Sequence, residues 1–278
     1  MRFARLRYST VQLFDTHCHL DLPVFESTLA SDLAQAKTQG VERFLIPSTS
    51  LESWARIEQL VSRDSDCIFY ALGIHPHFIP LSTPAQLLQQ LEHKLSVAQH
   101  ACVAIGECGL DALIDQPAER QEALLIGQLS IAQAFQKPVI LHSRKTHQRL
   151  IQMIKQMKFT QGGVLHAFSG SRQEAKQFID LGFKLGVGGV ITYPRANKTR
   201  QAIASVSIED LVLETDAPDM PLLGYQGQAN CPLRLPLVLR ELARLHQTEP
   251  EQIAPIIWQT SHRLFGLSTA DERDESNK

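Results

Sequence analysis

The stretch "FDTHCHLD", residues 14–21, places His17 and His19 one residue apart at the end of a strand-like segment. In a β-strand, side chains at positions i and i+2 leave the same face, so the two imidazoles point together and Cys18 points away. Such a pair can supply two neighbouring ligands to one metal ion. Histidines also cap strands and hydrogen-bond to carbonyl groups, so the pair alone leaves both interpretations open.

Short apolar segments alternate with amphipathic stretches of helical spacing along the rest of the chain. Eight segments are predicted to be strands: residues 12–20, 43–48, 68–75, 102–108, 138–143, 163–168, 183–190 and 210–216. Eight strands alternating with helices over about 250 residues are typical of a (β/α)₈ TIM barrel, which is the fold we predict. A doubly wound open sheet is the alternative, because alternation by itself does not show closure.

Metal-binding or acidic side chains stand at the C-terminal ends of these predicted strands. They are His17, His19, His75, Glu107, His142, His166 and Asp216. In a barrel all strand C-termini meet at one mouth, so residues far apart in the chain should converge on one pocket. Imidazoles and carboxylates gathered there would provide ligands for one or two divalent cations.

Composition sets limits on what the protein can do. The chain has 278 residues with 27 Lys and Arg against 29 Asp and Glu, a net charge of -2 that predicts no general attraction to a polyanion. The five cysteines form no CxxC pair and are odd in number, which favours reduced thiols. No signal peptide and no membrane-spanning run is evident, so we expect a cytoplasmic protein with no membrane association. We predict one domain over residues 1–266, a disordered tail over 267–278, and no protein partner.

Six motifs in this order resemble the TatD-related metal-dependent deoxyribonucleases, a family within the amidohydrolase-like TIM barrels: "FDTHCHLD", "GIHPH", "AIGECGLD", "PVILHSR", "GVLHAFSGS" and "LVLETDAPDMPL". The segments "GVGGVITYPRANKTR" and "LLGYQGQAN" further resemble the YjjV-like subgroup. The resemblance runs from Phe14 to the last predicted helix. It implies two divalent metal ions, one held by His17, His19 and Asp216, the other by His142 and His166, with Glu107 bridging them.

Two positions depart from the family pattern. Members often carry an aromatic residue after "GLD", where this chain has Ala112. Many have Asn-Thr before the final Leu-Phe pair, where Gln259 precedes Thr260 here. Neither position is a proposed ligand.

Individual residues can be given chemical roles with an alternative for each. Asp216 could orient or deprotonate the attacking water, or act as a ligand only. Glu214 could orient a ligand. His75 could contact the substrate or leaving group, or bond only to backbone. Positive residues follow the fifth and seventh strands, and Arg144, which shares the direction of His142, is the preferred substrate contact.

Three functions fit these observations. The first is a deoxyribonuclease that uses Mg²⁺, Mn²⁺ or Zn²⁺ to cleave DNA. The second is a hydrolase of a small anionic amide, ester or phosphomonoester on the same site, since fold and ligands do not fix the substrate. The third is a non-catalytic binding protein, which the intact set of proposed ligands argues against.

Overall fold

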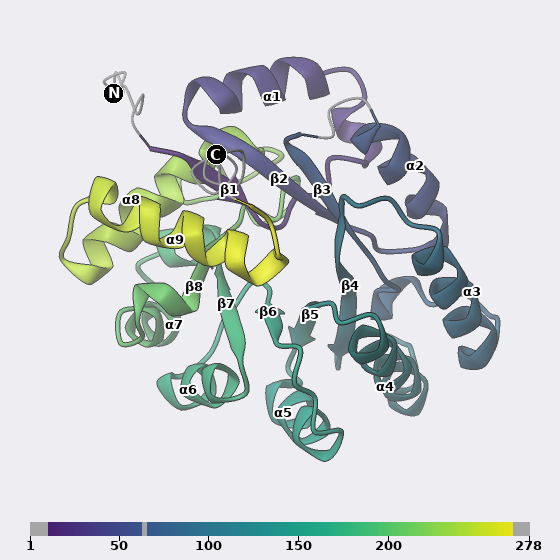
Figure 1. The fold of residues 1–278 in the computed structure, drawn as a ribbon. Helices are drawn as coiled ribbons and strands as arrows, with labels where there is room; N and C mark the ends of the chain where they lie inside the picture. Colours follow the sequence, from purple (N-terminus) through teal and green to yellow (C-terminus); the bar gives the residue numbers. More distant parts are fainter. Residues whose placement is uncertain (1–10, 63–65, 269–278) are drawn as a thin grey trace, which may run out of the picture.

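The computed structural model describes residues 11–62 and 66–268, and within them eight parallel strands form one sheet in sequential order (Figure 1). The strands are β1 (Leu13–Asp15), β2 (Val41–Pro47), β3 (Ile68–Leu72), β4 (Cys102–Asp111), β5 (Val139–Arg144), β6 (Gly163–Leu165), β7 (Phe183–Val187) and β8 (Leu211–Leu213).

Helices surround the strands and connect each strand to the next (Figure 1). The α-helices are α1 (Leu29–Thr38), α2 (Leu51–Val61), α3 (Pro84–Ser96), α4 (Ala118–Ala134), α5 (His147–Gln156), α6 (Arg172–Asp180), α7 (Asn197–Ile203), α8 (Leu235–His246) and α9 (Pro250–Phe265). Short 3₁₀ helices are η1 (Pro23–Phe25), η2 (Pro76–Phe78), η3 (Gly189–Thr192), η4 (Ile208–Asp210) and η5 (Pro232–Arg234).

Backbone hydrogen bonds close the sheet between its first and last strands. Thr16 N–H donates to the Leu213 carbonyl at 3.0 Å, and Asp216 N–H donates to the His17 carbonyl at 2.8 Å. Cys18 and Ala217 extend this parallel pairing one step further. The prediction of a barrel is therefore confirmed, and the open doubly wound sheet is ruled out.

Two apolar clusters account for the buried surface. One fills the barrel with side chains from the strands and from the C-terminal part of α9, including Phe14, Leu45, Phe69, Ile140 and Phe265. The other packs the outward-facing strand residues against the helix ring. The parallel strands are thus buried on both faces, which is why the sequence of each strand is almost continuously apolar.

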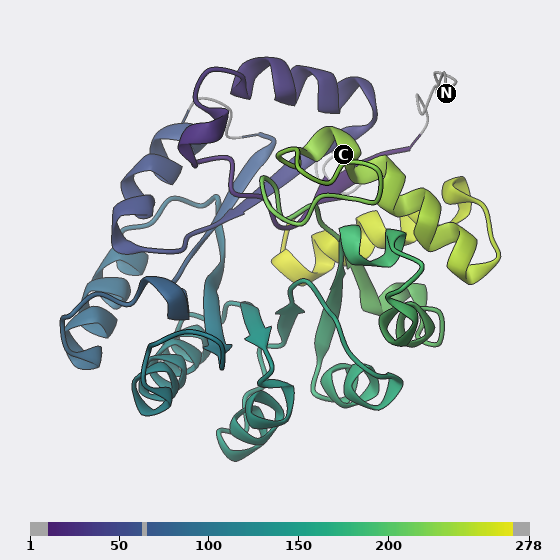
Figure 2. The same ribbon diagram turned by 180° about the vertical axis from the view of Figure 1, so that it is seen from behind.

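The two ends of the barrel are covered differently. Helix α9 crosses in front of the strands in Figure 1 and lies behind them in Figure 2. The chain between β8 and η5 lies toward the viewer in Figure 2, at the C-terminal end of the barrel. The C-terminal ends of the strands therefore face away from α9.

All eight predicted strands exist, but several are shorter than expected. The segment 12–20 contains a strand only over Leu13–Asp15, and 210–216 only over Leu211–Leu213. Within the second segment Asp216 adopts a left-handed conformation, with φ of 56°, so that segment is not extended throughout. In the opposite sense, β4 continues past residue 108 to Asp111.

No helix in residues 11–62 and 66–268 is long and apolar enough to cross a membrane. The predicted domain limit at residue 266 stays a prediction. The predicted disordered tail, residues 267–278, falls almost entirely outside the described residues.

Candidate metal centre

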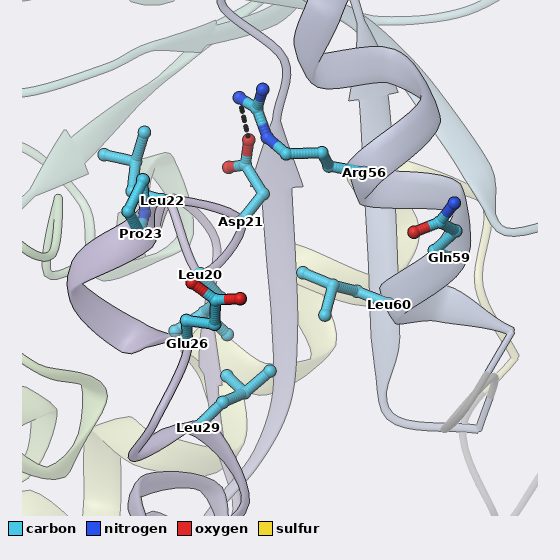
Figure 3. A pocket seen from close by; sticks show the side chains of 9 residues that line it. All are labelled: Leu20, Asp21, Leu22, Pro23, Glu26, Leu29, Arg56, Gln59 and Leu60. Carbon is cyan, nitrogen blue, oxygen red and sulfur yellow. Dashed lines mark hydrogen bonds and ion pairs between the residues drawn. The ribbon is translucent and has the colours of Figure 1, made fainter.

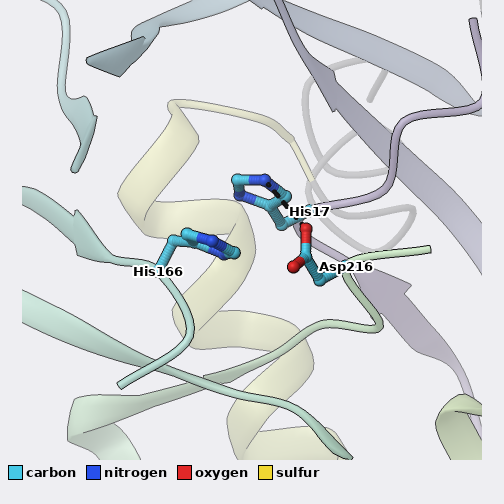
Figure 4. Close-up of side chains that lie close together, drawn as sticks. All are labelled: His17, His166 and Asp216. Atoms are coloured by element: carbon cyan, nitrogen blue, oxygen red, sulfur yellow. Dashed lines mark ion pairs between the residues drawn. The ribbon is translucent and has the colours of Figure 1, made fainter. Parts of the chain in front are cut away.

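The seven residues expected at the barrel mouth do come together at the C-terminal ends of the strands. His17 and His19 follow β1, Glu107 and His142 lie within β4 and β5, and the other three follow β3, β6 and β8. Figure 4 shows His17, His166 and Asp216 pointing toward one another from separate segments. The barrel thus joins residues nearly 200 positions apart.

His17 and His19 converge as their spacing predicts, although they lie beyond the end of the strand. Their Nε2 atoms are 3.2 Å apart. The segment stays extended because Cys18 N–H donates to the Leu45 carbonyl and His19 N–H to the Ala217 carbonyl. The Cys18 side chain points away, with its sulfur 3.7 Å from the same Leu45 carbonyl.

Glu107 occupies the centre of the cluster. Its Oε2 lies 3.2 Å from His17 Nε2 and 3.7 Å from His19 Nε2. Its Oε1 lies 3.4 Å from His75 Nε2, 3.0 Å from His142 Nδ1 and 3.6 Å from His166 Nε2. One carboxylate oxygen therefore faces one group of imidazoles and the other faces a second group, as a bridging ligand would.

Asp216 completes the first group. Its Oδ1 lies 3.5 Å from the Nε2 atoms of both His17 and His19. Three sets of ligand atoms lie close enough to share an ion: His17, His19 and Glu107; His75, Glu107 and His142; and His17, His166 and Asp216. This grouping differs from the one implied by the family resemblance, because His75 joins His142 and His166 stacks against His17 with ring centroids 3.7 Å apart.

The donor set fits a divalent cation. A neutral imidazole carries a proton on only one ring nitrogen, so it presents a lone pair at the other. The Nε2 atoms of His17 and His19 face each other and two carboxylates, and a shared cation would remove the repulsion between those lone pairs. Mixed imidazole and carboxylate ligands suit Zn²⁺ or Mn²⁺, and carboxylates suit Mg²⁺.

Burial and the neighbouring charges shift the pKa values of the cluster in different directions. Burial raises the pKa of the Glu107 carboxyl, but His75, His166 and His17 outweigh it and hold the pKa well below its usual range. Burial and the nearby His166 lower the pKa of His17, and burial lowers that of His75. The Glu107 carboxylate is therefore ionised, as a metal ligand must be.

Against the opposing effect of burial, Asp216 and Glu107 raise the pKa of His19. Burial is likewise outweighed at His166, where Glu214 and Asp216 raise the pKa to about 10. Binding of a cation would have to displace the proton from these two imidazoles.

Two further carboxylates hold the ligand imidazoles from behind. Asp111 Oδ2 lies 3.3 Å from His142 Nε2, on the side away from Glu107. Glu214 Oε1 lies 3.3 Å from His166 Nδ1 and accepts a hydrogen bond from Ala167 N–H at 2.6 Å. Glu214 lies beside a proposed ligand, where the sequence suggested it could orient one, whereas the sequence motifs did not point to Asp111. The even spacing of Glu107 and Asp111 along one strand was the signal that could have found it.

Asp15 ties the two closing strands together beneath the cluster. It is fully buried, and its carboxylate accepts hydrogen bonds from Thr215 N–H at 2.9 Å and Thr215 Oγ1 at 2.6 Å. His17 and Asp216 are thereby fixed at the top of a single seam.

The positively charged loops are only partly available to a substrate. Arg149 pairs with Glu122, Lys198 with Glu174, and Arg200 with Glu241, while Arg195 lies over the Tyr193 ring. Arg144 is exposed beside a pocket of about 630 Å³ and has no carboxylate partner in the described residues. His77 is exposed at η2, whereas His75 is buried and faces Glu107.

A smaller pocket of about 230 Å³ lies between the segment after His19 and helix α2 (Figure 3). It contains an ion pair between Asp21 and Arg56, at 3.2 Å, and apolar side chains including Leu22 and Leu60. None of the candidate ligands lines it. We therefore place the candidate site at the barrel mouth.

Comparisons with known proteins agree with the motifs. The family model of TatD related DNase matches residues 14–266. The uncharacterized metal-dependent hydrolase YjjV of Escherichia coli strain K12 is 42% identical over 257 residues, which cover 92% of this chain and 98% of that protein. The crystal structure of Escherichia coli YjjV has a TM-score of 0.86 at 41% identity, covering 92% of this chain and 98% of its own. The 3′-5′ ssDNA/RNA exonuclease TatD of a Rahnella species is 30% identical over 266 residues, covering 92% and 99%.

Proposed function

The chain belongs to the TatD-related DNase family and is a metal-dependent hydrolase of that family, and from this premise we propose that it is a deoxyribonuclease. It would hydrolyse phosphodiester bonds of DNA at the barrel mouth, with His17, His19, Glu107, His142, His166 and Asp216 as ligands of two divalent cations. The observation that carries the proposal is the position of Glu107, whose two oxygens face five imidazoles from four different strands.

Divalent cations at this position would supply Lewis-acid activation of water and neutralise charge on the scissile phosphate. The protein's own groups have separate tasks. Asp216, at the mouth and partly accessible, orients the attacking water and accepts its proton. Glu107 fixes the spacing of the two ligand groups. His75 lies beside Glu107 and His142, where it contacts the substrate or the leaving group.

The substrate side of the proposal rests on charge. Arg144, at the end of β5, lines a pocket that begins one residue after His142, and no ion pair ties it to a carboxylate of the described residues. A guanidinium there favours a phosphate over a neutral amide or ester, because its planar fork matches phosphate oxygens. The name of the Rahnella relative includes RNA, so single-stranded RNA belongs among the substrates to be tested.

We also propose a cytoplasmic location. Cys18, Cys102 and Cys108 are buried free thiols and Cys231 is a half-buried one, which suits a reducing compartment.

Degradation of single-stranded oligonucleotides tests the function directly. The 3′-labelled and 5′-labelled forms would be incubated with Mg²⁺ or Mn²⁺, beside the Asp216→Asn variant and, as a matched control, Asp180→Asn at the exposed end of α6. Stepwise loss of label by the wild type and Asp180→Asn, abolished in Asp216→Asn, supports the proposal and gives its direction. If neither labelled end is degraded while a small ester or phosphomonoester is hydrolysed, the small-molecule alternative replaces it.

A further inference from the structure

A second pocket begins one residue after His142 and is built mostly from the end of β5, the turn after it and the start of α5. Its lining comprises residues 143–149 together with Ser169, Glu174 and Lys198, and it encloses about 630 Å³. Ser143 directly follows His142, and Ser169 follows His166 by three residues. The pocket therefore adjoins the loops that carry two of the proposed ligands.

The charge of this pocket is strongly positive for a chain whose net charge is -2. Four cations line it, Arg144, Lys145, Arg149 and Lys198, against a single carboxylate, Glu174. Arg149 forms a two-pronged pair with Glu122, and Lys198 lies 3.3 Å from Glu174. Arg144 and Lys145 are exposed and have no acidic partner in the described chain, so two positive charges remain uncompensated.

The backbone places Arg144 beyond His142 on the same strand, with Lys145 in the turn that follows. Arg144 is the last residue of β5 and pairs in register with Asp111, whose side chain contacts His142. Because a strand advances about 3.3 Å per residue, Arg144 begins about 7 Å beyond His142 along the same strand. Lys145 then adopts a left-handed conformation, with φ of 62°, and the chain turns into α5.

We propose that this pocket binds the phosphate next to the scissile one, so that the enzyme acts on oligonucleotides in preference to substrates with a single phosphodiester. The inference rests on the proposed nuclease function and specifies its substrate class. Arg144 and Lys145 would hold the neighbouring phosphate while the scissile phosphate lies at the cluster around Glu107. Spacing, free positive charge and open volume all suit a nucleic acid backbone passing along the end of β5.

Two variants with equal loss of charge test the pocket. Arg144→Gln/Lys145→Gln removes its two unpaired cations. Lys155→Gln/Lys158→Gln removes two exposed lysines near the far end of α5. A fluorescein-labelled thymidine tetranucleotide would be titrated onto each double variant in an Asp216→Asn background, at several salt concentrations, with fluorescence anisotropy as the readout. Loss of the one single-strand phosphate contact that the pocket provides should reduce the slope of log K against log salt by about 0.7 in the pocket variant.

Kinetics with two substrates provide the second readout, and these measurements use proteins that retain Asp216. The thymidine tetranucleotide is compared with the p-nitrophenyl ester of thymidine 5′-phosphate, which has only one phosphodiester. The proposal predicts that kcat/KM in the pocket variant falls at least about tenfold further on the tetranucleotide than on the ester. Lys145→Gln alone should also lose more kcat/KM on the tetranucleotide than on the ester, but by a smaller factor.

Different failures have different meanings. Equal losses on both substrates, or a salt slope like that of the Lys155→Gln/Lys158→Gln control, would overturn the pocket proposal. Failure of the wild type to cleave either substrate would overturn the nuclease function, and the anisotropy titration would still decide whether the pocket binds a polynucleotide backbone.

Discussion

Glu214 illustrates how much a ligand depends on the residue behind it. Its buried carboxylate lies 3.3 Å from His166 Nδ1 and is anchored by Ala167 N–H. An anionic partner on one ring nitrogen fixes the imidazole's orientation and makes the other nitrogen a better ligand. We therefore expect Glu214→Gln to weaken Mn²⁺ binding by about 10–100-fold. Calorimetric titration with Mn²⁺ measures this, with the exposed Glu209→Gln as control, and equal affinity in Glu214→Gln and wild type would contradict it.

Asp15 gives a pH-dependent prediction at the seam. Burial raises the pKa of its carboxyl from 3.8 to about 7, against the opposing hydrogen bonds from Thr215. The folded state thus holds this proton more tightly than the unfolded state, and the resulting stabilisation is complete below pH 3.8 and lost as the pH rises through 7. The difference between a pKa of 3.8 and one of about 7 limits the contribution of Asp15 to the free energy of unfolding to about 4 kcal/mol.

Asp15→Asn should remove this dependence. Between pH 5 and 8, in chelator, the free energy of unfolding of the wild type should fall relative to that of the variant. Urea unfolding at several pH values measures the difference. Parallel pH profiles for the two proteins would show that Asp15 does not titrate in this range.

For individual residues, the sequence predicts the polar side chains that interrupt an apolar strand, but it does not reveal the residues that support them. His17, His19, Glu107 and Asp216 interrupt apolar runs, and such an interruption is visible in one dimension. Asp15 and Asp111 also lie at strand ends, but their partners, Thr215 and His142, are distant in sequence. The register between strands shows that Asp111 reaches His142 and that Asp15 reaches Thr215.

Among the elements, β7 differs from its neighbours because a carboxylate occupies the space beside it. A Cβ atom at Gly186 would lie 2.3 Å from Glu214 Oε2 and 2.7 Å from Glu214 Cδ. Glu214 has no room to retreat, since it is fully buried and bonded to Ala167. The absence of a side chain at this point of β7 is what admits Glu214 behind His166.

Gly186→Ala should therefore destabilise the protein by about 1–3 kcal/mol, the usual cost of overpacking. Gly188→Ala is the matched control two residues later, where the nearest atom would be 3.4 Å away, an ordinary contact. Chemical denaturation of both variants tests the prediction. A Gly186→Ala protein as stable as Gly188→Ala would show that Glu214 can move aside.

Apolar runs and helical spacing locate these elements well but not their ends. The run over residues 12–20 looks continuous, yet β1 ends at Asp15, and the parallel pairing resumes at Cys18 with Ala217. Strand β4 runs on to Asp111 because it keeps pairing with β5 as far as Arg144. These limits depend on the partner strand, which a pattern within one segment does not contain.

For the whole molecule, closure is the property that alternation of strands and helices leaves open. The structure closes through β1 and β8, where Thr16 bonds to Leu213 and Asp216 to His17. The proposed ligands lie on the same seam: His17 and His19 on one side, Asp216 on the other, at 3.5 Å. A cation bound there would join residues that are nearly 200 positions apart and would oppose opening of the barrel.

Metal removal should consequently lower stability as well as activity. At a Mn²⁺ concentration 100 times the Kd, binding to the folded state alone contributes about 2.7 kcal/mol. At about 2–4 °C per kcal/mol for a chain of this size, EDTA should lower the Tm by about 5–10 °C. The Asp216→Asn variant, which loses one side of the seam, should show a smaller shift. Hydrogen exchange locates the effect, because Mn²⁺ should protect the amides of Thr16 and Asp216 more than those of α5. A Tm unaffected by EDTA, or protection spread evenly over the helices, would mean that no cation links β1 to β8.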